Sequence, residues 1–448
     1  MSETFDMACR TLVIGLGKTG LSVARFLAQR GVQVAIVDSR ENPPGLAQLR
    51  AELPHDVALF LGGFRHEAFE RAEQIVISPG VSSAHAEIAA AVARGVPLLG
   101  DIELFARTAT APVIAVTGSN GKSTVVTLLS AMARRAGMDV RTGGNIGTPA
   151  LDLIQEQEPD LYVLELSSFQ LETTRSLHAQ AAVVLNISAD HLDRYPDLDA
   201  YAAAKQVIYR AAGCQVVNAD DPLAAALADP ARRQIRFSRQ QPGGDDYGLI
   251  DVDGAPWLAR GTHALLPASA IRMAGRHNVS NALAALALGE AAGLPQDAML
   301  ATLTEFKGLP HRMQPVAEHG GVHWFNDSKG TNVGATLAAI DSVDGKVVLI
   351  AGGDGKGADF NPLAAALQEK GRAAVLIGKD APQIAAVLAD VVPVSHADDM
   401  AQAVALAAGL AQPGDCVLLS PACASTDMFS DFAARGEVFT ECVRRYLA

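Results

Sequence analysis

The chain has 448 residues, of which 49% are hydrophobic and 19% are charged. This composition favours packed globular domains over disorder, and the length predicts about three of them. The formal net charge of −13 argues against a general binder of nucleic acid or of anionic membranes.

Two further features bear on location. The five cysteines are scattered without C-x-x-C spacing, which is typical of reduced thiols: Cys9, Cys214, Cys416, Cys423 and Cys442. The first residues have neither the basic nor the apolar segment of a signal peptide, and no apolar run has the length of a membrane span. We therefore expect a cytoplasmic protein.

The first region, residues 1–101, alternates strands with helices. The sequence predicts strands at 11–15, 32–37 and 75–78 and helices at 20–30 and 84–94. Gly15-x-Gly17-x-x-Gly20 follows the first strand and Asp38 follows the second, which is the fingerprint of a dinucleotide-binding turn. These residues leave open whether the turn binds a nicotinamide cofactor or another nucleotide.

The central region, residues 102–309, opens with a phosphate-binding pattern. A β-branched strand at 113–116 leads into the loop at 117–121, and Lys122-Ser123-Thr124 begins an amphipathic helix that extends to about Arg135. Glycines let backbone N–H groups approach an anion, and a helix N-terminus carries roughly half a positive charge. The loop is shorter than the usual pattern because its first glycine is Gly118. We expect it to bind a nucleoside triphosphate.

Three further polar groups of this region are candidates for chemistry. Glu165 interrupts an apolar strand at 161–166, where a carboxylate is costly unless it is paired, binds a metal or points outward at the strand end. Asp190-His191 follows a strand at 181–186, at the ligand edge of an open sheet. Lys205 lies in a helical stretch and, on its own, reads like any surface lysine.

The last region, residues 310–448, alternates again. Expected strands at 347–350, 374–377 and 417–419 lead into loops rich in Gly, Ser and Lys, which predicts a second open sheet with a ligand at its carboxyl edge. Before them, Asn326-Asp-Ser-Lys-Gly-Thr-Asn332 is too polar for a core and too compact for a linker.

Taken in order along essentially the whole chain, the motifs resemble the ATP-dependent Mur ligases of peptidoglycan synthesis. The motifs are Thr117-Gly-Ser-Asn-Gly-Lys-Ser-Thr124, Gly144-Asn-Ile-Gly147, Leu164-Glu-Leu-Ser-Ser168, Asp190-His-Leu-Asp-Arg-Tyr195, Leu309-Pro-His-Arg312, Asn326-Asp-Ser-Lys-Gly-Thr-Asn332, Gly352-Gly-Asp-Gly-Lys356 and Leu419-Ser-Pro-Ala-Cys-Ala-Ser425. The resemblance implies an α/β fold of three domains: a Rossmann-like UDP-binding domain (1–101), a P-loop ATP-binding domain (102–309) and a Rossmann-like amino-acid-binding domain (310–448).

The resemblance also implies a reaction. It is strongest to members that add D-glutamate to UDP-N-acetylmuramoyl-L-alanine through an acyl phosphate, with ATP and two Mg²⁺ ions. Such an enzyme serves cell wall biogenesis and thereby cell shape and division.

Site residues follow from the resemblance by position. Those implied to be catalytic are Lys122, Glu165, His191 and Lys205. The metal ligands would be Ser123, Thr124, Glu165, His191 and a carbamylated Lys205. The ATP-binding set is Gly118, Asn120, Gly121, Lys122, Ser123, Thr124, Asn278, His311, Arg312 and Asp327.

The substrate residues are implied in the same way. UDP would contact Thr19, Asp38, Ser39, Arg40 and Gly80, although Lys18 departs from the apolar residue expected beside them. The muramoyl-alanine portion would contact Asn145, Ser167 and Gln170. D-Glutamate would contact Lys329, Thr331, Lys356, Ser420 and Phe429.

Three competing hypotheses remain. A nicotinamide-dependent oxidoreductase would use only the first region and leave the ATP loop idle. A nucleotide-regulated binding protein would not need Glu165, His191 and Lys205 together. A sibling ligase would add another amino acid or act on folate.

Overall fold

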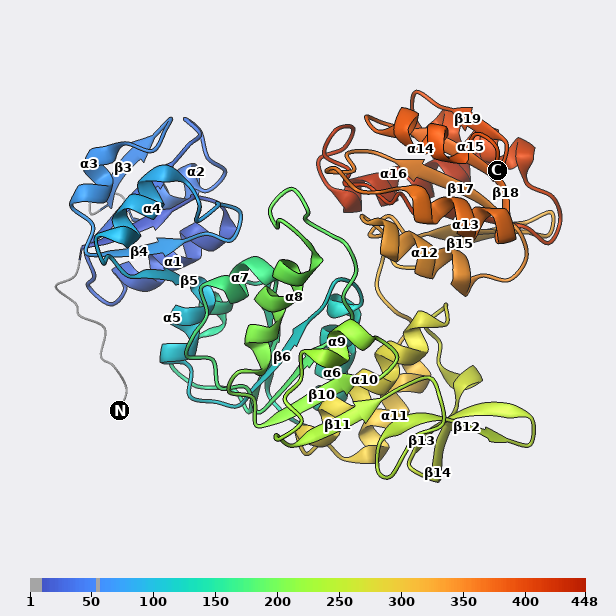
Figure 1. Ribbon diagram of the computed structural model, residues 1–448, viewed down its shortest axis with the longest axis horizontal. Helices are drawn as coiled ribbons and strands as arrows, with labels where there is room; N and C mark the ends of the chain where they lie inside the picture. Colours follow the sequence, from blue (N-terminus) through green and yellow to red (C-terminus); the bar gives the residue numbers. More distant parts are fainter. Residues whose placement is uncertain (1–9, 54–56) are drawn as a thin grey trace.

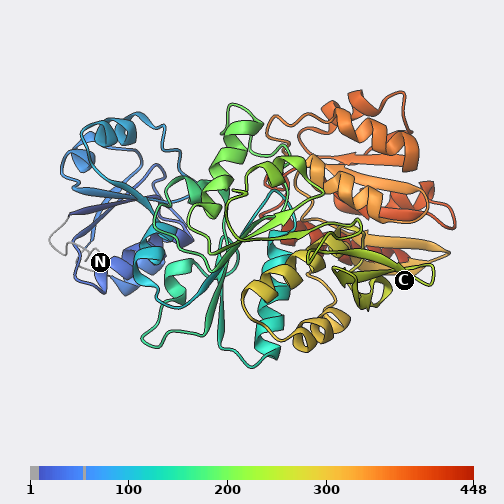
Figure 2. The same ribbon diagram turned by 60° about the horizontal axis from the view of Figure 1, so that its bottom comes forward.

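The structure, a computed structural model, describes residues 10–53 and 57–448. Cys9 and the first residues, on which the signal-peptide prediction rests, lie outside the described residues. Figures 1 and 2 show three α/β units in a row, with the central unit between the N-terminal and C-terminal ones. Each unit has its own β-sheet, and the predicted fold class is confirmed.

The N-terminal unit contains a five-stranded parallel sheet in the order β3-β2-β1-β4-β5. Its strands are β1 (Thr11–Ile14), β2 (Val34–Asp38), β3 (Val57–Leu61), β4 (Gln74–Ile77) and β5 (Leu98–Gly100). Its helices are α1 (Lys18–Ala28), α2 (Leu46–Glu52), α3 (His66–Glu70) and α4 (Ala86–Ala93). The strand order reverses at β1, so the turn after β1 opens into the crevice where such sheets bind ligands.

The turn from β1 into α1 is tighter than the sequence predicts. Helix α1 begins at Lys18 with Gly17 as its N-cap, two residues before the predicted start at Gly20. A Cβ atom on Gly20 would lie 1.8 Å from the carbonyl oxygen of Gly15. Only glycine lets the helix pack this closely on the turn.

The central unit contains a nine-stranded sheet in the order β14-β13-β12-β11-β10-β9-β6-β8-β7. Its strands are β6 (Val113–Thr117), β7 (Val140–Gly144), β8 (Leu161–Glu165), β9 (Ala181–Val184), β10 (Cys214–Asn218), β11 (Gln234–Phe237), β12 (Tyr247–Val252), β13 (Ala255–Arg260) and β14 (His263–Pro267). Strands β12–β14 form an antiparallel extension, and the others are parallel. Strand β6 lies between β9 and β8, where the strand order reverses.

Helices cover both faces of this sheet. They are α5 (Asp101–Thr108), α6 (Lys122–Arg135), α7 (Ser168–Glu172), α8 (Leu198–Gln206), α9 (Pro222–Ala226), α10 (His277–Ala291) and α11 (Gln296–Glu305). Short 3₁₀ turns lie at η1 (Ala150–Leu153), η2 (Val207–Tyr209) and η3 (Ala268–Ala270). The helix predicted around Lys205 is therefore α8 followed directly by η2.

The C-terminal unit contains a six-stranded sheet in the order β15-β16-β20-β17-β18-β19, with only β15 antiparallel to its neighbour. Its strands are β15 (Gln314–His319), β16 (Val322–Asn326), β17 (Val347–Gly352), β18 (Gly371–Ile377), β19 (Val394–His396) and β20 (Cys416–Leu419). Its helices are α12 (Val333–Ser342), α13 (Asn361–Lys370), α14 (Ala381–Leu388), α15 (Met400–Leu410) and α16 (Phe432–Leu447).

Apolar packing explains these elements. Every residue of β6, β9 and β17 is buried, as expected for parallel strands covered on both faces. Helices α6 and α10 cover one face of the central sheet through side chains such as Leu129 and Leu286. A second cluster runs from Val13 in β1 through Phe105 in α5 to Tyr201 in α8, so the first two units share a core. No helix among the described residues has the length and apolarity that would let it cross a membrane.

A buried carboxylate on α5 holds the segment that follows α7 within the central unit. Glu103 accepts hydrogen bonds from the backbone N–H groups of Arg175 and Ser176, at 2.6 and 2.9 Å, and from the Ser176 hydroxyl at 2.7 Å. Arg107 pairs with the same carboxylate at 2.8 Å, and the Glu103 side chain has no exposed surface. Burial alone would raise the pKa of Glu103, but these hydrogen bonds lower it below its ordinary value.

Replacing Glu103 tests these hydrogen bonds. Glu103→Ala should lower the free energy of unfolding by about 3 kcal/mol at pH 7, because two N–H groups and a hydroxyl lose a buried acceptor. Because the folded-state pKa is lowered, the contribution is complete above the ordinary glutamate pKa of about 4.3 and is lost as pH falls through the folded value.

Urea unfolding of both proteins from pH 7 to pH 3 measures the effect. The difference between wild type and variant should shrink below about pH 4. Glu156→Ala, at an exposed position, serves as the control and should unfold like wild type. A Glu103→Ala protein as stable as this control would contradict the assignment.

Candidate active site

The phosphate-binding loop lies at the carboxyl edge of the central sheet. Strand β6 ends at Thr117, and α6 begins after Gly121, which is its N-cap. Gly118 and Gly121 have φ values of 144° and 86°, which favour glycine. A Cβ atom on Gly121 would lie 2.5 Å from Oδ1 of Asn281, so the loop passes directly beside α10. The N–H groups of the first turn of α6 have no acceptor within the helix and suit an anion.

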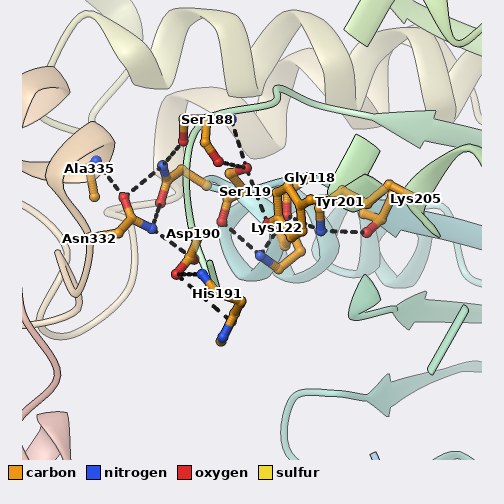
Figure 3. A network of polar contacts seen from close by, with 12 residues as sticks. Gly118, Ser119, Lys122, Ser188, Asp190, His191, Tyr201, Lys205, Asn332 and Ala335 are labelled. Atoms are coloured by element: carbon orange, nitrogen blue, oxygen red, sulfur yellow. Dashed lines mark hydrogen bonds and ion pairs between the residues drawn. The ribbon is translucent and has the colours of Figure 1, made fainter. Parts of the chain in front are cut away.

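Two amino groups, one from the half-buried Lys122 and one from the buried Lys205, converge on one carbonyl of this loop (Figure 3). The Nζ atoms of Lys122 and Lys205 donate to the oxygen of Gly118 at 2.8 and 3.0 Å. Lys205 is 1% exposed, and its Nζ lies 4.5 Å from the ring centre of Tyr201. Burial lowers the pKa of Lys205 well below its ordinary value, and the charge of Lys122 lowers it further. Because both amino groups use neutral oxygens as acceptors, the loop favours an anionic ligand.

Glu165, at the end of β8, offers a free oxygen beside the loop. Its Oε1 accepts a hydrogen bond from Nδ2 of Asn145 at 2.8 Å, whereas its Oε2 is buried without a partner. A buried oxygen without a partner is energetically unfavourable, and a bound cation would supply the missing partner. The part of the chain that the structure describes has no cluster of three or more His, Cys, Asp or Glu positioned for a metal. A site that uses Glu165, a loop hydroxyl, water and phosphate oxygens fits Mg²⁺, which keeps several non-protein ligands.

His191 lies in the loop that follows β9. Its backbone has a φ of 55°, and its N–H donates to Oδ1 of Asp190 at 3.0 Å. Its imidazole meets the ring of Phe169 edge-on, with the ring centres 4.8 Å apart. Burial lowers the pKa of His191, and the charge of Asp190 only partly opposes this. The ring is therefore neutral at pH 7 and can serve as a metal ligand.

A cavity of about 480 Å³ opens beside the loop, between the central and C-terminal units. Five of the residues predicted to bind nucleotide line it: Asn120, Gly121, Thr124, Arg312 and Asp327. Two predicted residues are engaged outside it. Asn278 donates to the carbonyl of Ala274, and a ring nitrogen of His311 lies 3.1 Å from Nδ2 of Asn326.

The sequence did not identify several polar and aromatic side chains of this cavity. They include Asn186, Asn218, Asp221, Phe237, Arg239 and Asn281. Most of them lie at the ends of β9, β10 and β11 or within three residues after them. The rule that pointed to Asp190, which places ligands at the carboxyl ends of parallel strands, could have found them as well.

Two basic side chains of the C-terminal unit face the same region. Arg312 donates from Nη2 to the hydroxyl of Ser123 at 3.0 Å. Lys329 places Nζ 3.9 Å from the ring centre of Phe432, a residue that the sequence did not point to. Burial and then the charge of Arg312 lower the pKa of Lys329 to about 8. Lys329 is thus mainly protonated at pH 7 and can bind a carboxylate.

The other side chains predicted to receive D-glutamate lie in different surroundings. Lys356 is exposed, and Thr331 is half-buried. Ser420 is fully buried and donates its hydroxyl to Oδ2 of Asp327 at 2.8 Å. Phe429 packs against an apolar cluster of the C-terminal unit.

The segment at 326–332 corrects one prediction. Its polarity led us to expect that it lies outside the core, yet Asn326 and Ser328 have no exposed surface. Asn326 donates to the carbonyl of Gly436, and Ser328 accepts from the guanidinium of the buried Arg435 at 2.9 Å. Satisfied hydrogen bonds make this polar segment compatible with burial.

A second cleft, of about 610 Å³, lies between the N-terminal and central units. It gathers all five residues that were predicted to bind UDP, namely Thr19, Asp38, Ser39, Arg40 and Gly80. Asn145 and Gln170 line the cleft from the central unit. Ser167 and Gln170 form a capping box at the start of α7, which fixes the Gln170 side chain.

Asp38 is held firmly within this cleft. Its Oδ2 accepts from the N–H of Leu16 and from Nη2 of Arg40, both at 2.7 Å. The carboxylate is buried, whereas the Arg40 side chain is exposed. The ion pair therefore presents the remaining guanidinium donors of Arg40 to the cleft.

Three protein-family descriptions match the chain in order. They are "Mur ligase MurD-like, N-terminal domain" over residues 9–100, "Mur ligase middle domain" over 116–289 and "Mur ligase, glutamate ligase domain" over 311–423. The chain is 58% identical to the UDP-N-acetylmuramoylalanine--D-glutamate ligase of Nitrosococcus oceani, across 99% of this chain and 98% of that protein. It is 54% identical to the ligase of the same name from Marinobacter nauticus, across 97% and 98%.

Solved structures share the fold at lower identity. The MurF ligase of Thermotoga maritima in complex with ADP has a TM-score of 0.63 and 17% identity, over 100% of this chain and 97% of that one. The UDP-N-acetylmuramate-alanine ligase MurC of the same organism has a TM-score of 0.61 and 19% identity, over 98% and 100%. At these identities the likeness shows the fold alone.

The free oxygen of Glu165 generates a binding prediction. Glu165→Gln removes a negative charge but keeps an acceptor for Asn145, so the affinity for Mg²⁺ in the presence of ATP should fall about 10- to 100-fold. Calorimetric titration of Mg²⁺ into the protein with saturating ATP measures this without turnover. Glu441→Gln, on the exposed surface of α16, is the control and should bind like wild type. An unchanged affinity in Glu165→Gln would exclude Glu165 as a ligand.

Proposed function

Because the chain belongs to the Mur ligase family, we propose that it joins D-glutamate to UDP-N-acetylmuramoyl-L-alanine at the expense of ATP, in peptidoglycan precursor synthesis. The observation that carries the choice of substrates is the full-length identity of 58% to a ligase of that name. The two clefts on either side of the central unit support it, since one suits a UDP-linked substrate and the other a triphosphate.

The chemistry proceeds in two steps. A carboxylate oxygen of the alanyl group bonds to the γ-phosphorus of ATP, the bond from that phosphorus to the bridging oxygen breaks, and ADP leaves. The neutral amine of D-glutamate then attacks the acyl carbon, the bond from that carbon to the phosphate oxygen breaks, and phosphate leaves as the nitrogen gives a proton to solvent. Both steps depend on positioning and on stabilising negative charge.

The basic side chains around the loop are proposed to stabilise the transferring phosphoryl group. Lys122 folds back onto the loop carbonyls at 2.8 Å and can turn toward a triphosphate without leaving the loop. Arg312 reaches the loop from the C-terminal unit through Ser123. The backbone of Gly118, Asn120 and Gly121 and the N-terminus of α6 would hold the phosphates.

Mg²⁺ would neutralise charge on the phosphates and orient them. Glu165, with the hydroxyl of Ser123 or Thr124, is proposed to hold one ion. His191 and a modified Lys205 are proposed to hold a second. The buried unpartnered oxygen of Glu165 and the lowered pKa of His191 support these roles.

We propose that Lys205 carries a carbamate. Only a neutral amine adds to CO₂, and burial favours the neutral form of Lys205. The nitrogen bonds to the carbon of CO₂ and loses a proton, so a buried amine becomes an anion. This anion would offset the charge of Lys122 and provide oxygen ligands for a metal.

The remaining roles are assigned by cleft. The UDP group would lie against Thr19, Asp38, Ser39, Arg40 and Gly80, and the muramoyl-alanine portion against Asn145, Ser167 and Gln170. Asn278 would act through its hydrogen-bond partner Asn281, whereas His311 and Asp327 would border the nucleotide. D-Glutamate would meet Lys329, Thr331 and Lys356, with Ser420 acting through Asp327 and with Phe429 and Phe432 nearby.

We also infer domain boundaries at 101/102 and 309/310, and the separation of the strands into three sheets supports a division into three domains. A cytoplasmic location is proposed because the reaction consumes ATP. The four described cysteines are free thiols, which agrees with this location.

An amino-acid panel tests the function. Phosphate release from ATP should require both UDP-N-acetylmuramoyl-L-alanine and an amino acid, and D-glutamate should be the best acceptor of the panel. L-Glutamate, L-alanine and diaminopimelate are the alternative acceptors in the panel. A separate titration followed by NAD(P)H fluorescence tests the oxidoreductase hypothesis, which predicts tight binding of that cofactor. Equal ADP formation without either substrate would overturn the assignment.

Lys205→Ala tests whether Lys205 belongs to the site. The variant should lose at least about 100-fold in kcat, because the second metal loses its anionic support. Added bicarbonate should not restore it, since no amine remains to react. Lys346→Ala, at an exposed lysine, is the control. Activity close to wild type would remove Lys205 from the site.

A further inference from the structure

Asn332 closes the polar segment at 326–332 and has no role in the reaction as proposed above. It is the N-cap of α12, where its Oδ1 accepts a hydrogen bond from the N–H of Ala335 at 2.8 Å. This contact alone would make Asn332 an ordinary helix cap.

The rest of its amide group is directed at the central unit (Figure 3). Nδ2 donates to Oδ1 of Asn120 at 3.2 Å and to Oδ2 of Asp190 at 3.1 Å. Oδ1 also accepts from Nδ2 of Asn120 at 3.3 Å. The residue is 7% exposed, and both of its amide hydrogens are used. A cap would need none of these three contacts.

Helix α12 is pressed against the central unit at both ends. A Cβ atom on Gly334, in its first turn, would lie 2.8 Å from the hydroxyl of Ser188. At its last residue, the Cβ of Ser342 lies 3.1 Å from where a Cβ on Gly275 would be. Helix α12 is therefore a docking element of the C-terminal unit, and Asn332 lies at the end nearest the phosphate loop.

The two partners of Asn332 belong to the two loops that build the site. Asn120 is in the phosphate loop, where its N–H and carbonyl are both held by the side chain of Asn186, at 2.8 and 3.0 Å. Asp190 precedes His191 and accepts its N–H at 3.0 Å. One amide from the C-terminal unit thus joins the phosphate loop to the loop of His191.

We propose that Asn332 is a positioning residue that couples docking of the C-terminal unit to the alignment of Asn120 and Asp190. The inference rests on the proposed function, because the docked unit is the one proposed to deliver D-glutamate. Loss of the amide donors releases Asp190 and lets α12 shift against the loop. D-Glutamate binding and kcat then suffer, whereas the UDP cleft, which lies between the other two units, is untouched.

Two variants separate positioning from capping. Asn332→Asp keeps the length and a good cap acceptor but loses both donors and faces the Asp190 carboxylate with a like charge. Asn332→Ser keeps the cap without adding charge, and its side chain is too short for Asn120 and Asp190. Asn361→Asp, at the exposed start of α13 in the same unit, is the matched control.

Steady-state kinetics and ligand titration give the main result. Both Asn332 variants should lose about 10- to 100-fold in kcat and raise KM for D-glutamate, while Kd for UDP-N-acetylmuramoyl-L-alanine stays at the wild-type value. In the double variant Asp190→Asn, Asn332→Asp, the loss in kcat should be at least about fivefold smaller than the product of the losses in the two single variants. The two losses are not independent, because the residues share one contact.

The outcomes are distinct. Asn332→Asp and Asn332→Ser proteins with wild-type kcat and KM would overturn the inference and leave the proposed function standing. A wild-type protein that does not ligate D-glutamate would overturn the proposed function instead. In that case small-angle scattering with MgATP still decides the contact: a larger radius of gyration in Asn332→Asp than in Asn361→Asp supports it, and equal radii reject it.

Discussion

The site depends on one shared contact, in which the carbonyl oxygen of Gly118 accepts hydrogen bonds from both Lys122 and Lys205. A carbonyl carries only a partial negative charge, so it satisfies the donors without neutralising them. Glu165 and Asp190 act on both amino groups from a greater distance. The loop is consequently built for anions: a triphosphate at the N-terminus of α6 and, in our proposal, a carbamate on Lys205. Lys205 is 1% exposed, so its hydrogen bonds to Gly118 and Thr117 replace those that water would otherwise make.

The charge of the site opposes that of the whole chain. The formal net charge is −13, yet Lys122, Lys205, Lys329 and Arg312 gather around one loop. Burial lowers the pKa values of Lys205 and Lys329, and the nearby charges of Lys122 and Arg312 lower them further. ATP, a UDP-sugar carboxylate and glutamate are all anions, and they repel one another as they approach. Concentrated positive charge from the protein and from Mg²⁺ is the physical requirement for bringing them together. The rest of the chain, which is acidic overall, does not need to attract these anions.

Local patterns in the sequence were sufficient to predict several elements of the site. The apolar run at β6, the glycines after it and the carboxylate that ends β8 each predicted a position that the structure brings to one sheet edge. Contacts that form only when separate units or helices pack together could not be predicted from the sequence. Three features of the site depend on how separate units and helices pack. Arg312 donates to Ser123, and Phe432 lies beside the amino group of Lys329. Asn278 does not line the cavity but binds Asn281, which does. Periodicity and spacing carry no information on that packing.

In the segment at 326–332, buried hydrogen bonds fix the backbone that carries two side chains of the site. Asn326 and Ser328 are held inside the C-terminal unit, the latter by the buried guanidinium of Arg435. Leaving any of these groups unpaired would be costly, so the segment has one arrangement that satisfies all of them. Lys329 and Asn332 are carried on that backbone: Asn332 reaches Asn120 of the central unit, and Lys329 lines the cavity between the two units. A softer, apolar segment would bury equally well, but it would not fix the direction of these two side chains.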